Sequence, residues 1–98
     1  MLDAVDRHIA KRLRSRRRRL CLTLVQVGSL CGISFQQVHK YESMISHVSA
    51  SMLWRLADAL GVGIQYFYDG LDPDDLRHAG TTGNPRPNLD GGVLAARN

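Results

Sequence analysis

Two short helix signatures, separated by a single turn, constrain this chain more than any other feature. Residues Thr23–Cys31 and Ser34–Ser43 each begin with a hydroxyl residue that is followed three positions later by glutamine. This spacing is the capping-box pattern of a helix N-terminus. Gly32 lies between the two stretches and is the type of residue that ends a helix. Two helices joined so tightly predict a helix-turn-helix, whose second helix normally enters the DNA major groove.

The outer surface of the second predicted helix has an unusual composition. Val38 and Tyr41 are spaced so that both side chains face the protein interior. The residues left on or near the outside are Phe35, Gln36, His39, Lys40 and Ser43. A glutamine amide offers a donor and an acceptor, which suits an adenine edge, and lysine suits a guanine edge or a phosphate. The pattern therefore favours contact with DNA bases.

Charge is distributed unevenly along the sequence. Eight of the thirteen lysines and arginines lie within the first twenty residues, and five of the nine acids lie between Asp58 and Asp75. The net charge is +4. This asymmetry indicates a polyanionic partner on one side of the protein. The alternative is a charged helix face that only promotes solubility.

Several functional classes have no support in the sequence. The two cysteines form no CxxC motif, which argues against a zinc site, and Cys31 is expected to be a buried free thiol. No stretch reaches the ~18 apolar residues that span a membrane, and polar residues interrupt the apolar run Leu20–Val27. The four histidines have no nucleophile or carboxylate at a catalytic spacing. We therefore expect a cytoplasmic protein that is not an enzyme and has no cofactor, metal or evident small-molecule ligand.

The remaining periodicity predicts three further helices and a tail. Asp3 is expected to cap a first helix, with Asp6 in its first turn and an apolar stripe of Val5, Ile9, Leu13 and Leu20. The second helix is expected to pack through Leu24 or Val25, Val27 and Leu30. Ser49 is expected to cap a fourth helix that buries Leu53, Leu56, Ala57 and Leu60 and ends at Gly61. A short fifth helix is expected at about 64–68. Residues 1–71 form the expected domain, and 72–98 read as a flexible tail, disordered from Gly80 onward.

The run from about Val5 to Leu71 resembles the Cro/repressor-type helix-turn-helix domain of bacterial and phage transcription factors. The motifs that carry the resemblance are G-I-S-F-Q-Q-V-H-K-Y-E at Gly32–Glu42 and V-S-A-S at Val48–Ser51, followed by Leu56–Val62 and Tyr66–Gly70. The resemblance implies an all-α, five-helix repressor-like domain. It also implies a sequence-specific regulator of transcription, expected to be a repressor, that binds double-stranded DNA.

The resemblance also assigns roles to individual residues. The implied base-reading positions are Ser34, Phe35, Gln36 and Lys40, flanked by Gln37, His39 and Ser43. The implied phosphate contacts are Arg12, Thr23, Gln26 and His47. Arg17 is implied to pair with Glu42 and so to fix the angle of the reading helix. Two of these residues have a structural alternative. For Gln37 the alternative is a role in the capping box alone, and for Phe35 it is packing onto the core.

The sequence departs from the family pattern at four places. Cys21 and Met44 stand where the family has glycine, Leu24 replaces a glutamine that grips phosphate, and Ser46-His47 replaces Asn-Arg. These changes point to weaker or altered DNA binding.

Two questions of assembly follow from the resemblance. Repressors of this type usually bind two half-sites, so we expect a homodimer that forms through Tyr66–Tyr68 and Leu71. The alternative is that these residues only close the monomer core. The rival function is a protein-interaction module, as in antitoxins, that uses the Tyr66–Asp75 end or the tail.

Overall fold

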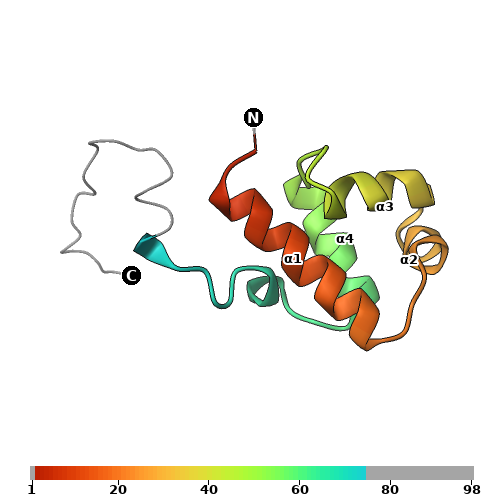
Figure 1. The fold of residues 1–98 in the computed structure, drawn as a ribbon. Helices are drawn as coiled ribbons and strands as arrows, with labels where there is room; N and C mark the ends of the chain where they lie inside the picture. The colour runs from red at the N-terminus through yellow and green to blue at the C-terminus, as the bar shows by residue number, and fades with distance from the viewer. Residues whose placement is uncertain (1, 75–98) are drawn as a thin grey trace.

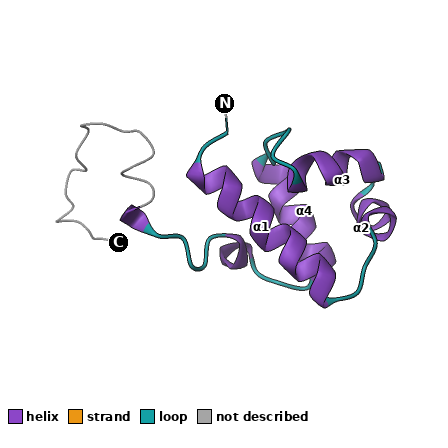
Figure 2. Ribbon diagram, in the orientation of Figure 1, coloured by secondary structure: helices purple, strands orange, loops and turns teal. Residues whose placement is uncertain are grey.

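The computed structural model describes residues 2–74, which form a bundle of helices joined by short loops (Figure 1). The α-helices are α1 (Ala4–Arg19), α2 (Leu24–Cys31), α3 (Phe35–Glu42) and α4 (Ala50–Leu60), followed by a 3₁₀-helix, η1 (Ile64–Phe67). Helices α1 and α4 cross at the centre, and α2 and α3 lie together at one end (Figure 2). The expected all-helical fold is confirmed for this part of the chain, which contains no strand.

The expected number of α-helices was too high by one. The segment after Gly61 forms only the four-residue η1, which has no side-chain hydrogen bond at its N-terminus. Its N-cap is Gly63, which has no side chain to accept such a bond, and the Tyr66 N–H instead bonds the Gly63 carbonyl at 3.0 Å. A glycine start therefore gives a single tight turn here. The expected disordered tail, apart from its first residues, lies outside the described residues.

The predicted helix starts are confirmed, with one correction. Asp3 and Asp6 form a reciprocal capping box on α1, and Thr23 and Gln26 form one on α2. Ser34 accepts a bond from the Gln37 backbone N–H at 3.1 Å. The expected return bond from the Gln37 side chain to Ser34 does not occur among the described residues. Gln37 therefore does not close a box on α3, and its amide is not committed to the helix end.

The core lies where α1, α2, α3 and α4 meet, and η1 closes it through Phe67. Its buried side chains are Ile9, Leu13, Val27, Cys31, Val38, Tyr41, Leu53, Leu56, Ala57, Leu60 and Phe67. Three predicted core residues are instead exposed: Leu20 (39%), Leu30 (59%) and Ile64 (39%). On α2 the inward position next to Leu30 belongs to Cys31. Burial raises the pKa of the Cys31 thiol, which keeps it protonated and free as expected.

Two positions where the resembling family has glycine adopt the left-handed backbone that glycine favours. Cys21 has φ 59° and Met44 has φ 63°. Cys21 lies in the turn that ends α1, where the Leu22 N–H bonds the Arg17 carbonyl at 3.0 Å. Met44 follows α3, where the Ile45 N–H bonds the Lys40 carbonyl at 2.8 Å. Each of these side chains costs ~1–2 kcal/mol in this conformation, so the two turns form against a local penalty.

Gly28 sets the distance between α2 and the turn that leads into α3. A Cβ atom at this position would lie 2.5 Å from the Ile33 carbonyl oxygen and 3.2 Å from the Ser34 carbonyl carbon. The Ile33 N–H also bonds the Gly28 carbonyl at 2.9 Å. The turn therefore packs directly on the backbone of α2. This contact fixes how α3 is presented.

Candidate nucleic-acid interface

Helix α3 presents a row of polar and aromatic side chains on the side away from the core. Val38 and Tyr41 are buried beneath it, as predicted. The exposed residues are Phe35, Gln36, His39, Lys40 and Ser43, with Ser34 exposed at the N-cap. Phe35 is 47% exposed and does not belong to the core cluster, so the alternative in which it folds onto the core does not hold. The predicted reading residues therefore share one accessible surface.

Hydrogen bonds on α3 leave its central polar groups available. His39 Nε2 and Ser43 Oγ lie 3.1 Å apart, one helical turn from each other. Gln36 and Lys40 are also one turn apart, and neither side chain has a hydrogen-bond partner among residues 2–74. An amide and an ammonium on one helix face are thus free to contact an external partner.

An ion pair anchors the C-terminal end of α3 to α1. Arg17 Nε lies 2.7 Å from Glu42 Oε2, and Arg17 Nη2 donates to Glu42 Oε1 at 3.0 Å. Only 13% of the Arg17 side chain and 5% of the Glu42 side chain are exposed. Arg17 Nη1 also donates to the Leu22 carbonyl at 2.9 Å. The hydrogen bond with Glu42 raises the pKa of Arg17 despite its burial. The Arg17 guanidinium therefore connects α1 both to α3 and to the loop that precedes α2.

The side chains expected to contact phosphate differ in how free they are. Thr23 Oγ1 accepts from the Gln26 backbone N–H at 3.0 Å, and Gln26 Oε1 accepts from the Thr23 N–H at 2.8 Å. The Thr23 hydroxyl and the Gln26 NH₂ remain as donors. The His47 side chain is 59% exposed, and its Nδ1 lies 3.2 Å from Asp6 Oδ1. These three residues are accessible near the helix-turn-helix.

Asp6 links the first turn of α1 to the loop after α3. Burial acts to raise the pKa of the Asp6 carboxyl. Hydrogen bonds from the Asp3 backbone, His47 and the Asp3 side chain, together with the charge of His47, outweigh that effect and hold the pKa below its usual value. The contact places His47 at the edge of α1 that faces α3.

Arg12, which the resemblance implied as a phosphate contact, is bound within the protein. Its Nε donates to the Tyr66 carbonyl at 2.8 Å, and its guanidinium carbon lies 3.7 Å from the centre of the Tyr66 ring. These contacts hold it against η1, whereas Arg17 on the neighbouring face of α1 reaches α3. The structure therefore does not bring Arg12 together with the α3 surface.

Two more basic residues share this arrangement, which the sequence reasoning missed. His8 Nε2 donates to the Asp69 carbonyl at 2.7 Å, and Arg16 Nε donates to the Leu60 carbonyl at 2.9 Å. We call His8, Arg12 and Arg16 the α1 clasp. Each donates to a main-chain carbonyl, either at the last residue of α4 or in the segment that follows α4. Their spacing of four residues was the available signal, since it places all three on one side of the helix.

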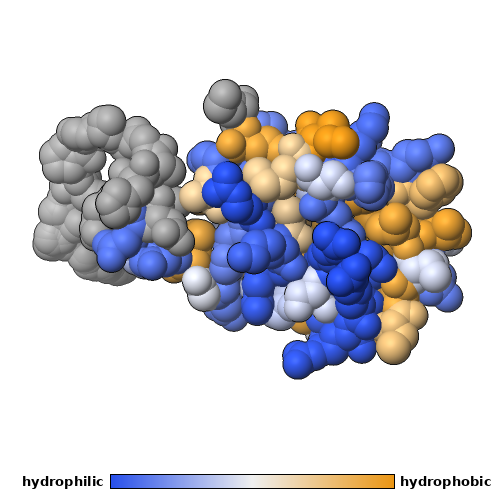
Figure 3. Space-filling view, in the orientation of Figure 1, coloured by the Kyte–Doolittle hydropathy of each residue, from blue (hydrophilic) through white to orange (hydrophobic). Residues whose placement is uncertain are grey.

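Helix α1 also carries basic residues of another kind. Arg7, Lys11, Arg14 and Arg18 are exposed and have no hydrogen bond or ion pair within the described chain. We call these four residues the outer stripe. Figure 3 shows hydrophilic side chains gathered over α1 on this face of the molecule. The side chains of the outer stripe expose their positive charge to solvent, whereas those of the α1 clasp bind carbonyl groups within the protein.

Residues 2–74 contain no group of three or more histidine, cysteine, aspartate or glutamate side chains placed to hold a metal ion. No helix in this part of the chain is long and apolar enough to cross a membrane.

Comparison with known proteins identifies the architecture. A helix-turn-helix family profile matches residues 13–67, which is more than half of the chain. A Rhodospirillum rubrum protein named as an uncharacterized transcriptional regulator in the ATPase CF(0) region is 43% identical over 76 residues, covering 78% of this chain and 70% of that protein. The chain belongs to this helix-turn-helix family of transcriptional regulators.

Other helix-turn-helix proteins are similar over the same region. An uncharacterized regulator of Sinorhizobium fredii is 38% identical over 78 residues, which cover 80% of this chain but only 54% of that regulator. The P22 c2 repressor, solved with a synthetic operator, superposes with a TM-score of 0.59 at 24% identity, covering 63% of this chain and 94% of the repressor domain. In this helix-turn-helix protein α2 and α3 are the two helices of the motif.

Proposed function

We propose that this protein is a sequence-specific DNA-binding regulator, of the repressor type, that reads the major groove with the outer face of α3. The observation that carries the proposal is the free amide of Gln36 and the free ammonium of Lys40 on one exposed helix face above a packed core. Names of the relatives and the operator complex of the P22 c2 repressor support the same function. We place its action in the cytoplasm, where its DNA target lies.

Base reading is assigned to Ser34, Phe35, Gln36 and Lys40, with Gln37, His39 and Ser43 flanking them. Gln36 suits an adenine edge, and the exposed ring of Phe35 suits a thymine methyl group. The bond between His39 and Ser43 limits the positions that the imidazole can take. Arg17 and Glu42 act indirectly, because their ion pair holds the end of α3 against α1.

Phosphate contacts are assigned to Thr23, Gln26 and His47, which have donors near the helix-turn-helix. Arg12 is left out, because its contacts with Tyr66 hold it away from the α3 surface. Leu24 is partly buried against the core, so the position that grips phosphate in the resembling family contributes packing here. We therefore expect weaker backbone binding than in proteins with glutamine at this position.

DNA binding is assigned to residues 1–71, and we propose that the protein binds DNA as a homodimer. Phe67 is fully buried, so it closes the monomer core and is not available for self-contact. Tyr66 and Leu71 are partly exposed, Tyr68 is 40% exposed, and Ile64 at the same end is 39% exposed, so these side chains are available to meet a second copy. Light scattering that finds a monomer both alone and on a palindromic site would reject the dimer.

Substitutions on α3 test the reading face. Gln36→Ala should weaken binding to the preferred site by ~1–3 kcal/mol and flatten the preference at one base position, because a bidentate base contact is lost. Lys40→Ala should do the same if Lys40 reads a base. If it binds only phosphate, all sequences should weaken alike and the salt slope should fall by about 1. Titration of matched and scrambled ~20 bp duplexes at several salt concentrations measures both effects.

Leu24→Gln is the matched gain-of-contact variant and should tighten binding, provided that its melting temperature shows that the core tolerates the change. If all three variants bind DNA like the parent, helix α3 is not the reader. The protein-interaction alternative would then account better for the exposed Tyr68 end, and co-purification of a protein partner would be the next measurement.

A further inference from the structure

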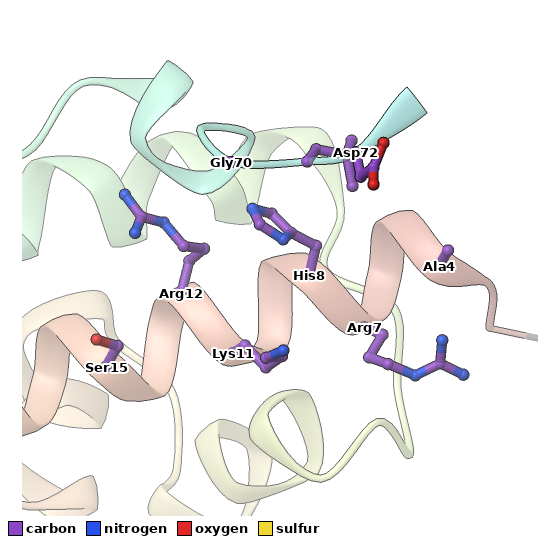
Figure 4. Close-up of a pocket in the computed structure, with 9 residues that line it drawn as sticks. Ala4, Arg7, His8, Lys11, Arg12, Ser15, Gly70 and Asp72 are labelled. Carbon is purple, nitrogen blue, oxygen red and sulfur yellow. The ribbon is translucent and has the colours of Figure 1, made fainter. Parts of the chain in front are cut away.

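A second surface lies on the far side of α1 from Arg17 and α3. The segment 70–72 runs beside α1 and leaves an open groove of about 620 Å³ between them (Figure 4). The α1 residues that line it are Ala4, Arg7, His8, Lys11, Arg12 and Ser15, and Gly70, Leu71 and Asp72 line the opposite side. Pockets of this volume accommodate small molecules such as nucleotides.

The walls of the groove are held in place by bonds within the protein. His8 Nε2 donates to the Asp69 carbonyl at 2.7 Å, directly before Gly70. Gly70 has φ 86° and approaches the His8 ring closely enough that a Cβ would lie 3.6 Å from His8 Cε1. Arg12 is fixed on Tyr66 through its Nε and its planar face. The groove is therefore formed before any ligand arrives.

Its charge is strongly unbalanced. Arg7 and Lys11 are exposed and have no hydrogen bond or ion pair within residues 2–74. The Nη groups of Arg12 have no hydrogen bond in the same region, and Ser15 adds a hydroxyl. Among the described lining residues Asp72 is the one acid, and its Oδ1 already accepts from the Asp74 N–H at 2.9 Å. Cationic and hydroxyl donors therefore lie along the α1 side of the groove.

We propose that this groove binds the phosphate groups of a small phosphorylated ligand of about nucleotide size. Lysine, arginine and hydroxyl donors provide charge-assisted hydrogen bonds that suit phosphate oxygens. The groove opens on the clasp side of α1, whereas Arg17 and Asp6 connect the other side to α3 and its following loop. A ligand in the groove and a duplex on α3 would therefore occupy different faces. The proposal does not depend on α3 being the DNA reader.

The test uses the full chain, labelled with ¹⁵N and titrated with inorganic pyrophosphate and with ATP at constant ionic strength. Saturable shifts of the amides of residues 7–15 and 70–72 are expected. The double variant Arg7→Gln/Lys11→Gln should bind at least about tenfold more weakly, because two charge-assisted contacts are lost. Asp72→Asn should bind more tightly, because it removes the opposing charge and keeps the oxygen that accepts from Asp74. Arg18→Gln, on the same helix but outside the groove, should bind like the parent.

A ~20 bp duplex distinguishes the source of the phosphate. If the duplex shifts only α3 amides and pyrophosphate still binds in its presence, the ligand is a free small molecule, as proposed. If the duplex instead shifts the groove amides and the double variant lowers its salt slope, the groove binds DNA phosphates and the small-molecule proposal fails. The proposal also fails if neither pyrophosphate nor ATP gives saturable shifts, or if Arg18→Gln weakens binding as much as the double variant. Unchanged far-UV circular dichroism shows that each variant is folded.

Discussion

Helix α1 carries two sets of basic residues and uses them in opposite ways. In the first set, Arg12, Arg16 and Arg17 are partly buried and bind acceptors within the protein. In the second set, Arg7, Lys11, Arg14 and Arg18 are exposed and have no partner among the described residues. Successive helical residues differ by about 100° in direction, so adjacent arginines in the Arg16–Arg19 run fall on different sides. A run of like charges is therefore not one functional unit.

The comparison also separates two forms of internal anchoring. Arg17 meets a carboxylate, and its pair is almost enclosed, so the loss of either partner leaves a charge without compensation. The residues of the α1 clasp meet neutral carbonyls at the edge of the molecule. Their loss removes a bond but does not strand a charge. We therefore expect three levels of effect: large for Arg17, moderate for the clasp, and small for the outer stripe.

Arg17→Ala tests the upper level and should give the largest loss of stability. It leaves Glu42 buried without a partner, which costs ~3–5 kcal/mol for a buried pair. Thermal and urea unfolding measure the change. Arg18→Ala is the matched control on the outer stripe and should stay within ~0.5 kcal/mol of the parent. Equal losses for the two variants would show that the ion pair has no special weight.

Arg16→Ala tests the clasp and should lower the free energy of unfolding by ~1–2 kcal/mol. The variant loses a hydrogen bond from a charged donor to the Leu60 carbonyl, near the end of α4 where a cation also favours the helix dipole. Arg14→Ala, two residues away in the exposed set, is the control and should be nearly neutral. The division of the basic residues of α1 into two sets would be wrong if Arg14→Ala destabilised the protein more than Arg16→Ala.

The sequence allowed much of the fold to be predicted, because the informative signals are local. The caps at Asp3, Thr23, Ser34 and Ser49 and the buried face of α4 depend only on residues a few positions apart. Errors occurred where the outcome depends on a distant partner. Leu30 has the right spacing for the core, yet Cys31 takes the place against α4, where its Sγ lies 3.8 Å from the Arg55 carbonyl.

The candidate site divides in the same way. The exposed face of α3 could be predicted from helical spacing alone. The family resemblance indicated Glu42 as the partner of Arg17, and the Arg17 guanidinium does bind the Glu42 carboxylate. The contacts of Arg12 could not be predicted, because its acceptor is the main-chain carbonyl of Tyr66, and no residue type marks a carbonyl that lacks a helix partner. The groove beside Gly70 was missed for the same reason, since its shape depends on the His8 bond to Asp69.

The smallest effect is expected at Asp6, the acid by which the α3 side of α1 holds His47. Asp6→Asn keeps an oxygen for the Asp3 N–H and removes only the charge. Because folding holds the pKa of Asp6 below its usual 3.8, the carboxylate stabilises the fold above that pH, and the contribution disappears as the pH falls through the lowered pKa. At neutral pH the variant should be less stable by at most ~1 kcal/mol, as for an exposed pair. The difference should close as the pH drops below 3.8. Melting curves of both proteins across this range measure the gap, with His47→Ala as the control that removes the partner. A gap that widens on acidification would mean that the charge on Asp6 opposes folding, and the α3 side of α1 would then depend on Arg17 alone.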